Sequence, residues 1–384
     1  MKKYFYIIVL SFFTISCETV NDYSFDQSGP IEKDALEKVG NAIVKSLQLK
    51  NEQEFYRHFD KDLFKLKVAE NLTYGLESVE NDYGINYFIE SAFEVLKDGE
   101  MSVRKFNLQQ VFEENGKGII VISSITENGI RFYEFIVTNY NNSHRIYDIY
   151  YTDLGFTLSD AIIKEFPYDW KGISYMDESS IWEIDNSYHQ EEYEEVIQEF
   201  NKLQKESQEQ PWMLGKFLGA IYQEGLYDGL DEKINRTPYN SDFLKYRLYR
   251  QMGSVDSLER YVNKIEARYG KSYLTSHFQQ EVLYYKNELE AAEAGLLKSL
   301  LFENDHAAPY VYLTYISVEK DRYKDAVKYL KILQKKFRRD PEELKSIYAD
   351  DEDFTSSKEY KAWLSSIIIR DVVSEAISQV ELID

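Results

Sequence analysis

Apolar residues recur at the spacing of one helix face through the first part of the chain. Between residues 31 and 98 they fall at intervals of three or four, which predicts amphipathic helices. The set is Ala35, Val39, Ile43, Leu47, Phe55, Phe59, Leu63 and Leu66. We expect a further helix over 83–96 with Phe88, Ala92, Phe93 and Leu96 inward, ended by Gly99.

From Met101 the apolar period changes from that of a helix to that of a strand. The chain then runs through four segments rich in β-branched and aromatic residues, at 101–113, 118–126, 130–140 and 145–151. They are divided at Asn115-Gly116, Asn128-Gly129 and Asn141-Asn142. Asn-Gly between such segments is the strongest short-range signal for a hairpin. We therefore expect an antiparallel meander of four strands.

Helices followed by a curved antiparallel sheet resemble the nuclear transport factor 2-like superfamily, a cone-shaped α+β fold. The segment from Arg145 to Ser159 looks like the closing strand and exit of many exported members. The resemblance implies an α+β domain over 31–160 with a cavity between helices and sheet. After it, Pro167 and Gly172 indicate a connector over 161–190.

The second half of the chain repeats with itself. Leu258, Ala292 and Ala326 are separated by 34 residues each, and Val262, Leu296 and Leu330 stand four places later. The unit from Pro309 to Phe337 has two helix-period segments around a turn at Asp321-Arg322-Tyr323. This pattern resembles tetratricopeptide repeats, which implies an all-α solenoid over 191–384 and a concave surface for peptides.

The first seventeen residues read as an export signal. Two lysines are followed by about a dozen apolar residues, too few for a spanning helix of roughly twenty. The stretch Thr14-Ile15-Ser16-Cys17 resembles the lipobox of bacterial lipoproteins, although Thr14 replaces the usual leucine. The resemblance implies a signal peptide at 1–16, acylated Cys17, a tether over 17–30 and attachment to an envelope membrane, most simply the outer membrane. The body would face the periplasm or the cell surface.

Composition narrows the possible partners. The chain has 45 Lys and Arg against 67 Asp and Glu, and removal of Lys2 and Lys3 leaves a formal charge of −24. A phosphate backbone needs the opposite sign, so we set nucleic acid aside. Cys17 is the only cysteine, so no internal disulfide can form.

No catalytic, cofactor or metal motif stands out in the sequence. Phosphate-binding glycine loops are missing, and no two of the five histidines have the spacing of a zinc helix. The run from Asp350 to Asp353 lacks the ligand spacing of a calcium loop, and we interpret it as a solvated turn. We expect no cofactor and no metal.

Two strand carboxylates are the sharpest chemical candidates. Alternation places Glu134 on the face of Phe132 and Ile136, and Asp148 on the face of Ile146 and Tyr150. A carboxylate inside an apolar cavity would have a raised pKa and could act as a base. The alternative interpretation is exposure to solvent, or pairing with Arg131 or Arg145.

These observations favour a non-catalytic, lipid-anchored envelope protein that binds a protein or peptide through its repeats. The positions expected to pack between repeat helices are Leu258, Ala292, Leu296, Ala326 and Leu330. One alternative is a surface lipoprotein that binds carbohydrate, which a soluble glycan that shifts the fluorescence of Trp170, Trp182 or Trp212 would favour. Another is a small-ligand or enzymatic site in the cone. The oligomeric state stays open.

Overall fold

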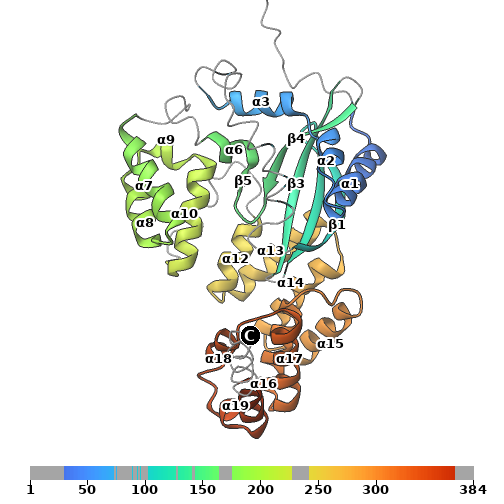
Figure 1. The fold of residues 1–384 in the computed structure, drawn as a ribbon, viewed down its shortest axis with the longest axis vertical. Coiled ribbons are helices and arrows are strands. Elements are labelled where there is room, and N and C mark those ends of the chain that lie inside the picture. The colour runs from blue at the N-terminus through green and yellow to red at the C-terminus, as the bar shows by residue number, and fades with distance from the viewer. Residues whose placement is uncertain are drawn as a thin grey trace, which may run out of the picture.

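The computed structural model describes most of the chain between Pro30 and Ile367. The described residues are 30–72, 75, 89, 93, 96, 103–126, 129–140, 143–163, 175–226 and 242–367. Figure 1 shows a twisted sheet with helices around it, and a further stack of helices that extends away from the sheet. This architecture confirms the predicted fold class, an α+β region followed by an all-α region. The segments predicted to be a signal peptide and a tether, with Cys17 between them, lie outside the described residues up to residue 29.

Three short helices open the described part of the chain: α1 (Lys33–Gln48), α2 (Glu52–His58) and α3 (Lys61–Ala69). Helix α1 is amphipathic and buries the side chains of Leu36, Val39, Ile43 and Leu47. Asn51 caps α2 by accepting from the Glu54 amide, and Asp60 caps α3 by accepting from the Asp62 and Leu63 amides. Of the helix expected over 83–96, Ile89, Phe93 and Leu96 are described, and all three are helical and buried.

The sheet is an antiparallel meander in sequence order. Its strands are β1 (Val103–Glu114), β2 (Lys117–Thr126), β3 (Gly129–Tyr140), β4 (Ser143–Tyr151) and β5 (Phe156–Thr157). Four match the predicted segments, and β5 is a short addition. Asn115 and Gly116 have φ angles of 51° and 74°, so this turn has the two left-handed residues of a tight hairpin. Asn128 and Asn141-Asn142 lie outside the described residues.

A bulge in the pairing of β3 with β4 reverses the predicted facing of one carboxylate. Ile136 pairs with Asp148, whereas its neighbour Val137 pairs with Ile146, so one residue of β4 is extra. Ile146 therefore packs into the core under the first helices, while Asp148 shares the opposite face with Tyr150. The prediction that Ile146 and Asp148 face the same way is wrong, because strict alternation assumes an unbroken ladder.

One face of the sheet packs against the helices that precede it in the chain. Ile120, Ile122, Phe135 and Val137 on this face belong to the same core as α1, α2 and α3. The ring of Phe55 lies 5.2 Å from that of Phe93 and 6.4 Å from that of Phe135, measured between centroids. This core joins the helices that precede the sheet to one of its faces.

The helices that follow the sheet extend this first core. They are α6 (Leu158–Ile163), the 3-10 turn η2 (Tyr175–Asp177), α7 (Glu178–His189), α8 (Tyr193–Lys202), α9 (Lys205–Gln208) and α10 (Pro211–Glu224). Phe200 and Phe217 stack with their centroids 4.0 Å apart, and Trp212 is buried beside them. The segment 161–190, expected to be an irregular connector, thus includes helix α7, whose Ile181 and Ile184 belong to the core of the sheet.

Helical hairpins make up the rest of the described chain. Their helices are α12 (Asp242–Gln251), α13 (Val255–Tyr269), α14 (Tyr273–Tyr285), α15 (Leu289–Leu300), α16 (Ala308–Glu319), α17 (Tyr323–Lys336), α18 (Pro341–Ile347) and α19 (Glu352–Ser356). Each of the helices α13, α15 and α17 is the second of a packed pair. Leu258, Ala292 and Ala326 are buried at matching places in them, as are Val262, Leu296 and Leu330.

The second face of the sheet is covered by the first of these hairpins. Val121 and Phe132 share a core with Phe243 of α12, Tyr269 of α13 and Phe278 of α14. The rings of Phe132 and Tyr269 stack at 4.7 Å with an angle of 8° between their planes. The sheet is therefore enclosed by helices from both halves of the chain (Figure 1).

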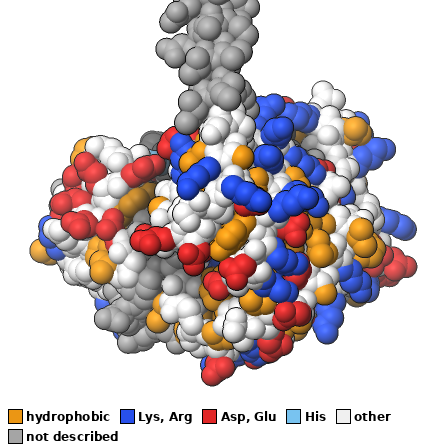
Figure 2. All heavy atoms as spheres, turned by 90° about the horizontal axis from the view of Figure 1, so that it is seen from below, with side chains coloured by type: hydrophobic (Ala, Val, Ile, Leu, Met, Phe, Trp, Pro, Cys, Tyr) orange, Lys and Arg blue, Asp and Glu red, His pale blue; other side chains and the backbone are white. Residues whose placement is uncertain are grey.

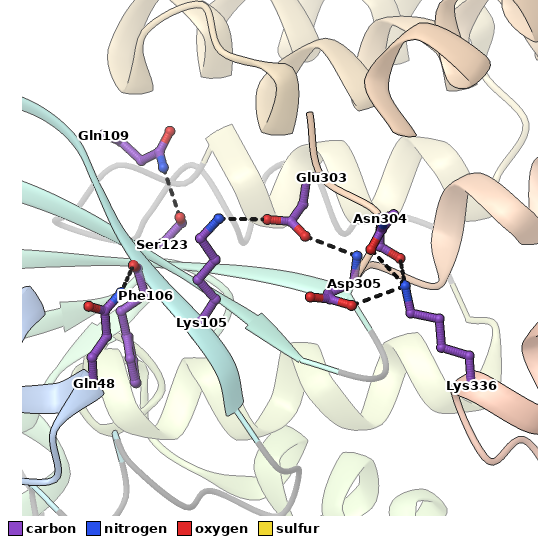
Figure 3. A network of polar contacts seen from close by, with 9 residues as sticks. All are labelled: Gln48, Lys105, Phe106, Gln109, Ser123, Glu303, Asn304, Asp305 and Lys336. Carbon is purple, nitrogen blue, oxygen red and sulfur yellow. Dashed lines mark hydrogen bonds and ion pairs between the residues drawn. The ribbon is translucent and has the colours of Figure 1, made fainter. Parts of the chain in front are cut away.

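Polar contacts also join the sheet to the helical half of the chain at the edge strand β1. Lys105 of β1 donates to Glu303 over 3.0 Å, and the other oxygen of Glu303 accepts from the Asp305 amide (Figure 3). The Asp305 carboxylate then meets Lys336 at 3.0 Å. A chain of contacts thus joins β1, the loop after α15 and the end of α17.

Candidate functional site

Glu134 is held in an ion pair between the sheet and α13. Arg268 donates to both of its oxygens over 2.7 Å and also meets Glu114 of β1 at 2.9 and 3.0 Å. Glu134 is only 3% exposed. Burial lowers the pKa of Arg268, but the carboxylates of Glu134 and Glu114 outweigh this effect and raise the pKa above its usual value. Sequence reasoning named Arg131 and Arg145 as partners, but Arg131 pairs with Asp153 at 3.7 Å and Arg145 donates to the Arg57 carbonyl. The true partner stands 134 residues away, where no local pattern indicates it.

Asp148 is fully buried in a polar cluster at the start of α6. Its oxygens accept from the Ile149 amide at 2.8 Å, the Ser159 amide at 3.1 Å and the Ser159 hydroxyl at 2.5 Å. Asp160 accepts from the amide and hydroxyl of Thr157 and so completes a capping box. Burial raises the pKa of Asp148 to about 6, against the lowering effect of the Ser159 hydrogen bond. The pKa of Asp148 is raised, as expected for a base in a cavity, but its oxygens accept hydrogen bonds from the first turn of α6.

The two carboxylates do not meet at a common ligand site. Glu134 faces α13, and Asp148 faces the turn into α6. An open pocket of about 390 Å³ lies near Glu134, lined by Gln110, Phe112, Asp242, Lys264, Ala267 and Arg268. Neither carboxylate is among its lining residues. A general base would need a free acceptor beside a space for substrate, and neither group has that arrangement here.

A second polar cluster, which no sequence pattern indicates, lies between α12, α14 and α16. Glu281 receives a hydrogen bond from the Tyr246 hydroxyl, and it lies 2.9 Å from His277 and 3.3 Å from Arg250. Burial alone would raise the pKa of Glu281, but Arg250 and His277 bring it down to about 2. His306 lies edge-on to His277 at 4.9 Å, and burial holds its pKa well below 6.5. The two histidines are 29 residues apart, so only folding pairs them.

Tyrosine rings form a connected row along the first helices of the later hairpins. We call Tyr284, Tyr285, Tyr312, Tyr315 and Tyr348 the tyrosine row. Tyr284 lies 5.4 Å from Tyr312 and 6.0 Å from Tyr315, and Tyr315 lies 5.4 Å from Tyr348. Tyr312 and Tyr348 are buried, whereas the other three are partly exposed. Burial and the nearby Glu319 carboxylate raise the pKa of Tyr284 to about 12. The row thus offers neutral aromatic surface to a ligand.

This row ends at a pocket that is both aromatic and acidic. The acidic pocket has a volume of about 550 Å³ and is lined by Tyr315, Val318, Glu319, Ile347, Tyr348, Asp350, Asp351, Glu352 and Asp353. Asp351 caps α19 by accepting from the Phe354 amide at 2.8 Å. Within the described residues, no lysine or arginine forms an ion pair with Glu319, Asp350, Glu352 or Asp353. The acidic run predicted to be a solvated turn therefore lines a pocket.

The tryptophans expected to report carbohydrate binding by fluorescence differ in exposure. Trp212 is 2% exposed in the core, whereas Trp182 on α7 is 67% exposed. Trp170 lies outside the described residues. A sugar could therefore stack on Trp182, but Trp212 has no free face.

Comparison with known proteins gives no relative. No family model, curated protein or solved structure matches this chain. Among the described residues no helix is long and apolar enough to cross a membrane. The same residues hold no group of three or more His, Cys, Asp and Glu side chains arranged for a metal ion.

Proposed function

We propose that this chain is a non-catalytic binding protein whose acidic pocket receives a basic segment of another protein. The observation that carries the proposal is the pocket itself, where carboxylates that pair with no described lysine or arginine lie beside the rings of Tyr315 and Tyr348. A lysine or arginine side chain satisfies both features, because its charge pairs with carboxylates and its cation is attracted to an aromatic face. The tyrosine row would then hold the residues that flank this side chain.

The helical half supports this proposal through its repeat. Buried residues at 34-residue intervals in α13, α15 and α17 are what tetratricopeptide-like hairpins require. In such arrays the first helices of successive hairpins line the surface that binds extended peptides. The tyrosine row lies on α14 and α16, which are first helices, and on the residue after α18.

The pocket is tested by neutralising its carboxylates. In affinity capture from the native envelope, the Asp350→Asn/Glu352→Gln/Asp353→Asn chain should lose partners that the unchanged chain retains. Peptide arrays of random sequence should give hits enriched in Lys and Arg, with affinity falling as salt rises. A matched control is Glu191→Gln/Glu192→Gln/Glu194→Gln, which removes three exposed charges from the region of α8. Equal loss in both variants, or neutral and acidic hits, would contradict the proposal.

We further propose that Cys17 anchors the chain to an envelope membrane as in bacterial lipoproteins. The supporting features are the apolar leader, the single cysteine and the polar residues that follow it. Mass spectrometry of the mature N-terminus should find an acylated Cys17. The Cys17→Ser chain should move from the membrane fraction to the soluble fraction, and retention in the membrane fraction would contradict the anchor.

A further inference from the structure

The outer face of α17 carries a row of lysines. Lys324, Lys328, Lys331 and Lys335 are all exposed, and their spacing of four, three and four residues confines them to an arc of about 60°. They extend over about 16 Å of helix, at a rise of about 1.5 Å per residue. Ala326, Leu330 and Leu333 on the opposite side are buried. We call these four residues the lysine row.

No carboxylate neutralises the lysine row within the described residues. The ion pairs of α17 and its ends involve Arg322, Lys336 and Arg339 instead. In a chain with 67 acidic and 45 basic residues, an outer helix face of lysines alone is unusual. The corresponding helix α13 exposes Asp256 along with Arg260 and Lys264, and α15 exposes Glu290 along with Lys298. The helix dipole favours a cation only near the last turn, so it accounts for Lys335 and not for the other three.

Exposed apolar side chains lie near the end of this row. Leu297, Leu301 and Phe302, at the end of α15, are 43%, 83% and 65% exposed. Lys336 donates to the carbonyl and side-chain oxygens of Asn304, which brings the end of α17 to the same loop (Figure 3). Figure 2 views this end of the molecule and shows Lys and Arg gathered along one side of it.

We propose that the lysine row and the exposed end of α15 together bind the headgroup region of an anionic lipid bilayer. The charge of the row complements lipid phosphates, and the protruding Leu301 and Phe302 can enter the boundary between headgroups and acyl chains. Nucleic acid would use the lysines but would leave these apolar side chains in water. The acidic surface elsewhere is repelled by such a bilayer, so the contact has one orientation.

The position of this surface has a consequence for the proposed anchor. Helix α1, which begins at Lys33, lies beside the sheet, and α17 lies in the stack of helices that extends away from the sheet (Figure 1). If Cys17 is acylated as proposed, the chain has two separated attachments, and its long axis lies along the membrane.

Vesicle sedimentation tests the surface without the anchor. Residues 18–384, which keep every described residue and lack Cys17, should bind vesicles of phosphatidylcholine with 30% phosphatidylglycerol and not pure phosphatidylcholine vesicles. The Lys328→Glu/Lys331→Glu chain should bind at least about 30-fold more weakly, because the two lost lysines contribute about 1 kcal/mol each and the two new carboxylates are repelled by the anionic surface. Phe302→Ser should weaken binding while leaving its salt dependence unchanged.

The control variant is Lys38→Glu/Lys45→Glu, which makes the same charge change on exposed positions of α1. It should bind the anionic vesicles as the unchanged chain does. Equal binding to both kinds of vesicle, equal loss in both double variants, or retention of duplex DNA in place of vesicles would overturn the proposal. Since the acidic pocket is unaltered in these chains, such a failure would leave the peptide-binding proposal standing.

Discussion

The two faces of the sheet are buried in different ways. One face packs on α1, α2 and α3 through apolar side chains such as Phe55 and Phe135, and the same core continues into α7, α8 and α10. The other face packs on α12, α13 and α14, more than a hundred residues later, and includes the Glu134–Arg268 pair beside the stacked rings of Phe132 and Tyr269. The first face is held mainly by apolar contacts, whereas the second face also includes a buried ion pair that favours one way of docking.

Glu134 shows how a residue that looks like a candidate for an active site can have a structural role. Glu134 has the burial expected of a cavity carboxylate, yet its two oxygens are engaged by one guanidinium. Breaking a buried pair is costly because the remaining charge is left without a partner, whereas replacing both members by apolar residues is often neutral. The pair thus adds specificity of docking more than net stability.

The largest expected effect comes from truncating a buried aromatic side chain on either face of the sheet. Phe135→Ala and Phe132→Ala should each lower the free energy of unfolding by about 3–5 kcal/mol, because both rings are fully buried. If the two faces form one cooperative unit, urea unfolding of both variants followed by circular dichroism stays a single transition. A separate early transition in Phe132→Ala alone would show that the helical half docks on the sheet without sharing its stability.

A smaller effect is expected at the ion pair. Glu134→Gln should lower the free energy of unfolding by about 3 kcal/mol, since Arg268 keeps Glu114 but loses its buried partner. Glu134→Leu combined with Arg268→Met should recover most of this loss. A double-mutant cycle by urea denaturation measures the coupling, and a coupling near zero would remove the specific role of the pair.

The effect expected at Asp148 depends on pH and reaches that of the ion pair only at high pH. Its folded pKa of about 6 is above the ordinary 3.8, so the folded state binds the proton more tightly and this group's contribution to stability grows as pH falls from 6 to 3.8. Asp148→Asn keeps the acceptor for the Ser159 amide and removes the buried charge. It should therefore be more stable than the unchanged chain at pH 8, by up to about 3 kcal/mol, with the advantage lost near pH 4.

Urea denaturation at the two pH values measures this difference. Ser187→Ala, at a buried position that carries no titrating group, serves as the pH-independent control. A constant difference between Asp148→Asn and the unchanged chain across this range would contradict the raised pKa.

Much of the fold was predictable because its signals are local. The helix period of α1, the turn at Asn115-Gly116 and the 34-residue spacing of Leu258, Ala292 and Ala326 depend on neighbours along the chain. The fold class followed from these elements. The bulge beside Ile136 could not be predicted, because it depends on how two strands pair and not on either strand alone.

The candidate sites show the same division. The sequence by itself determined that Glu134 and Asp148 stand in apolar strands, that the last helices repeat, and that Asp350 to Asp353 form an acidic run. Only the tertiary structure decided that Glu134 pairs with Arg268, that Asp148 caps a helix, and that the acidic run closes a pocket against Tyr315. The physical reason is range: periodicity and turn chemistry act over a few residues, whereas the partner of a buried charge is set by the docking of segments far apart in the chain.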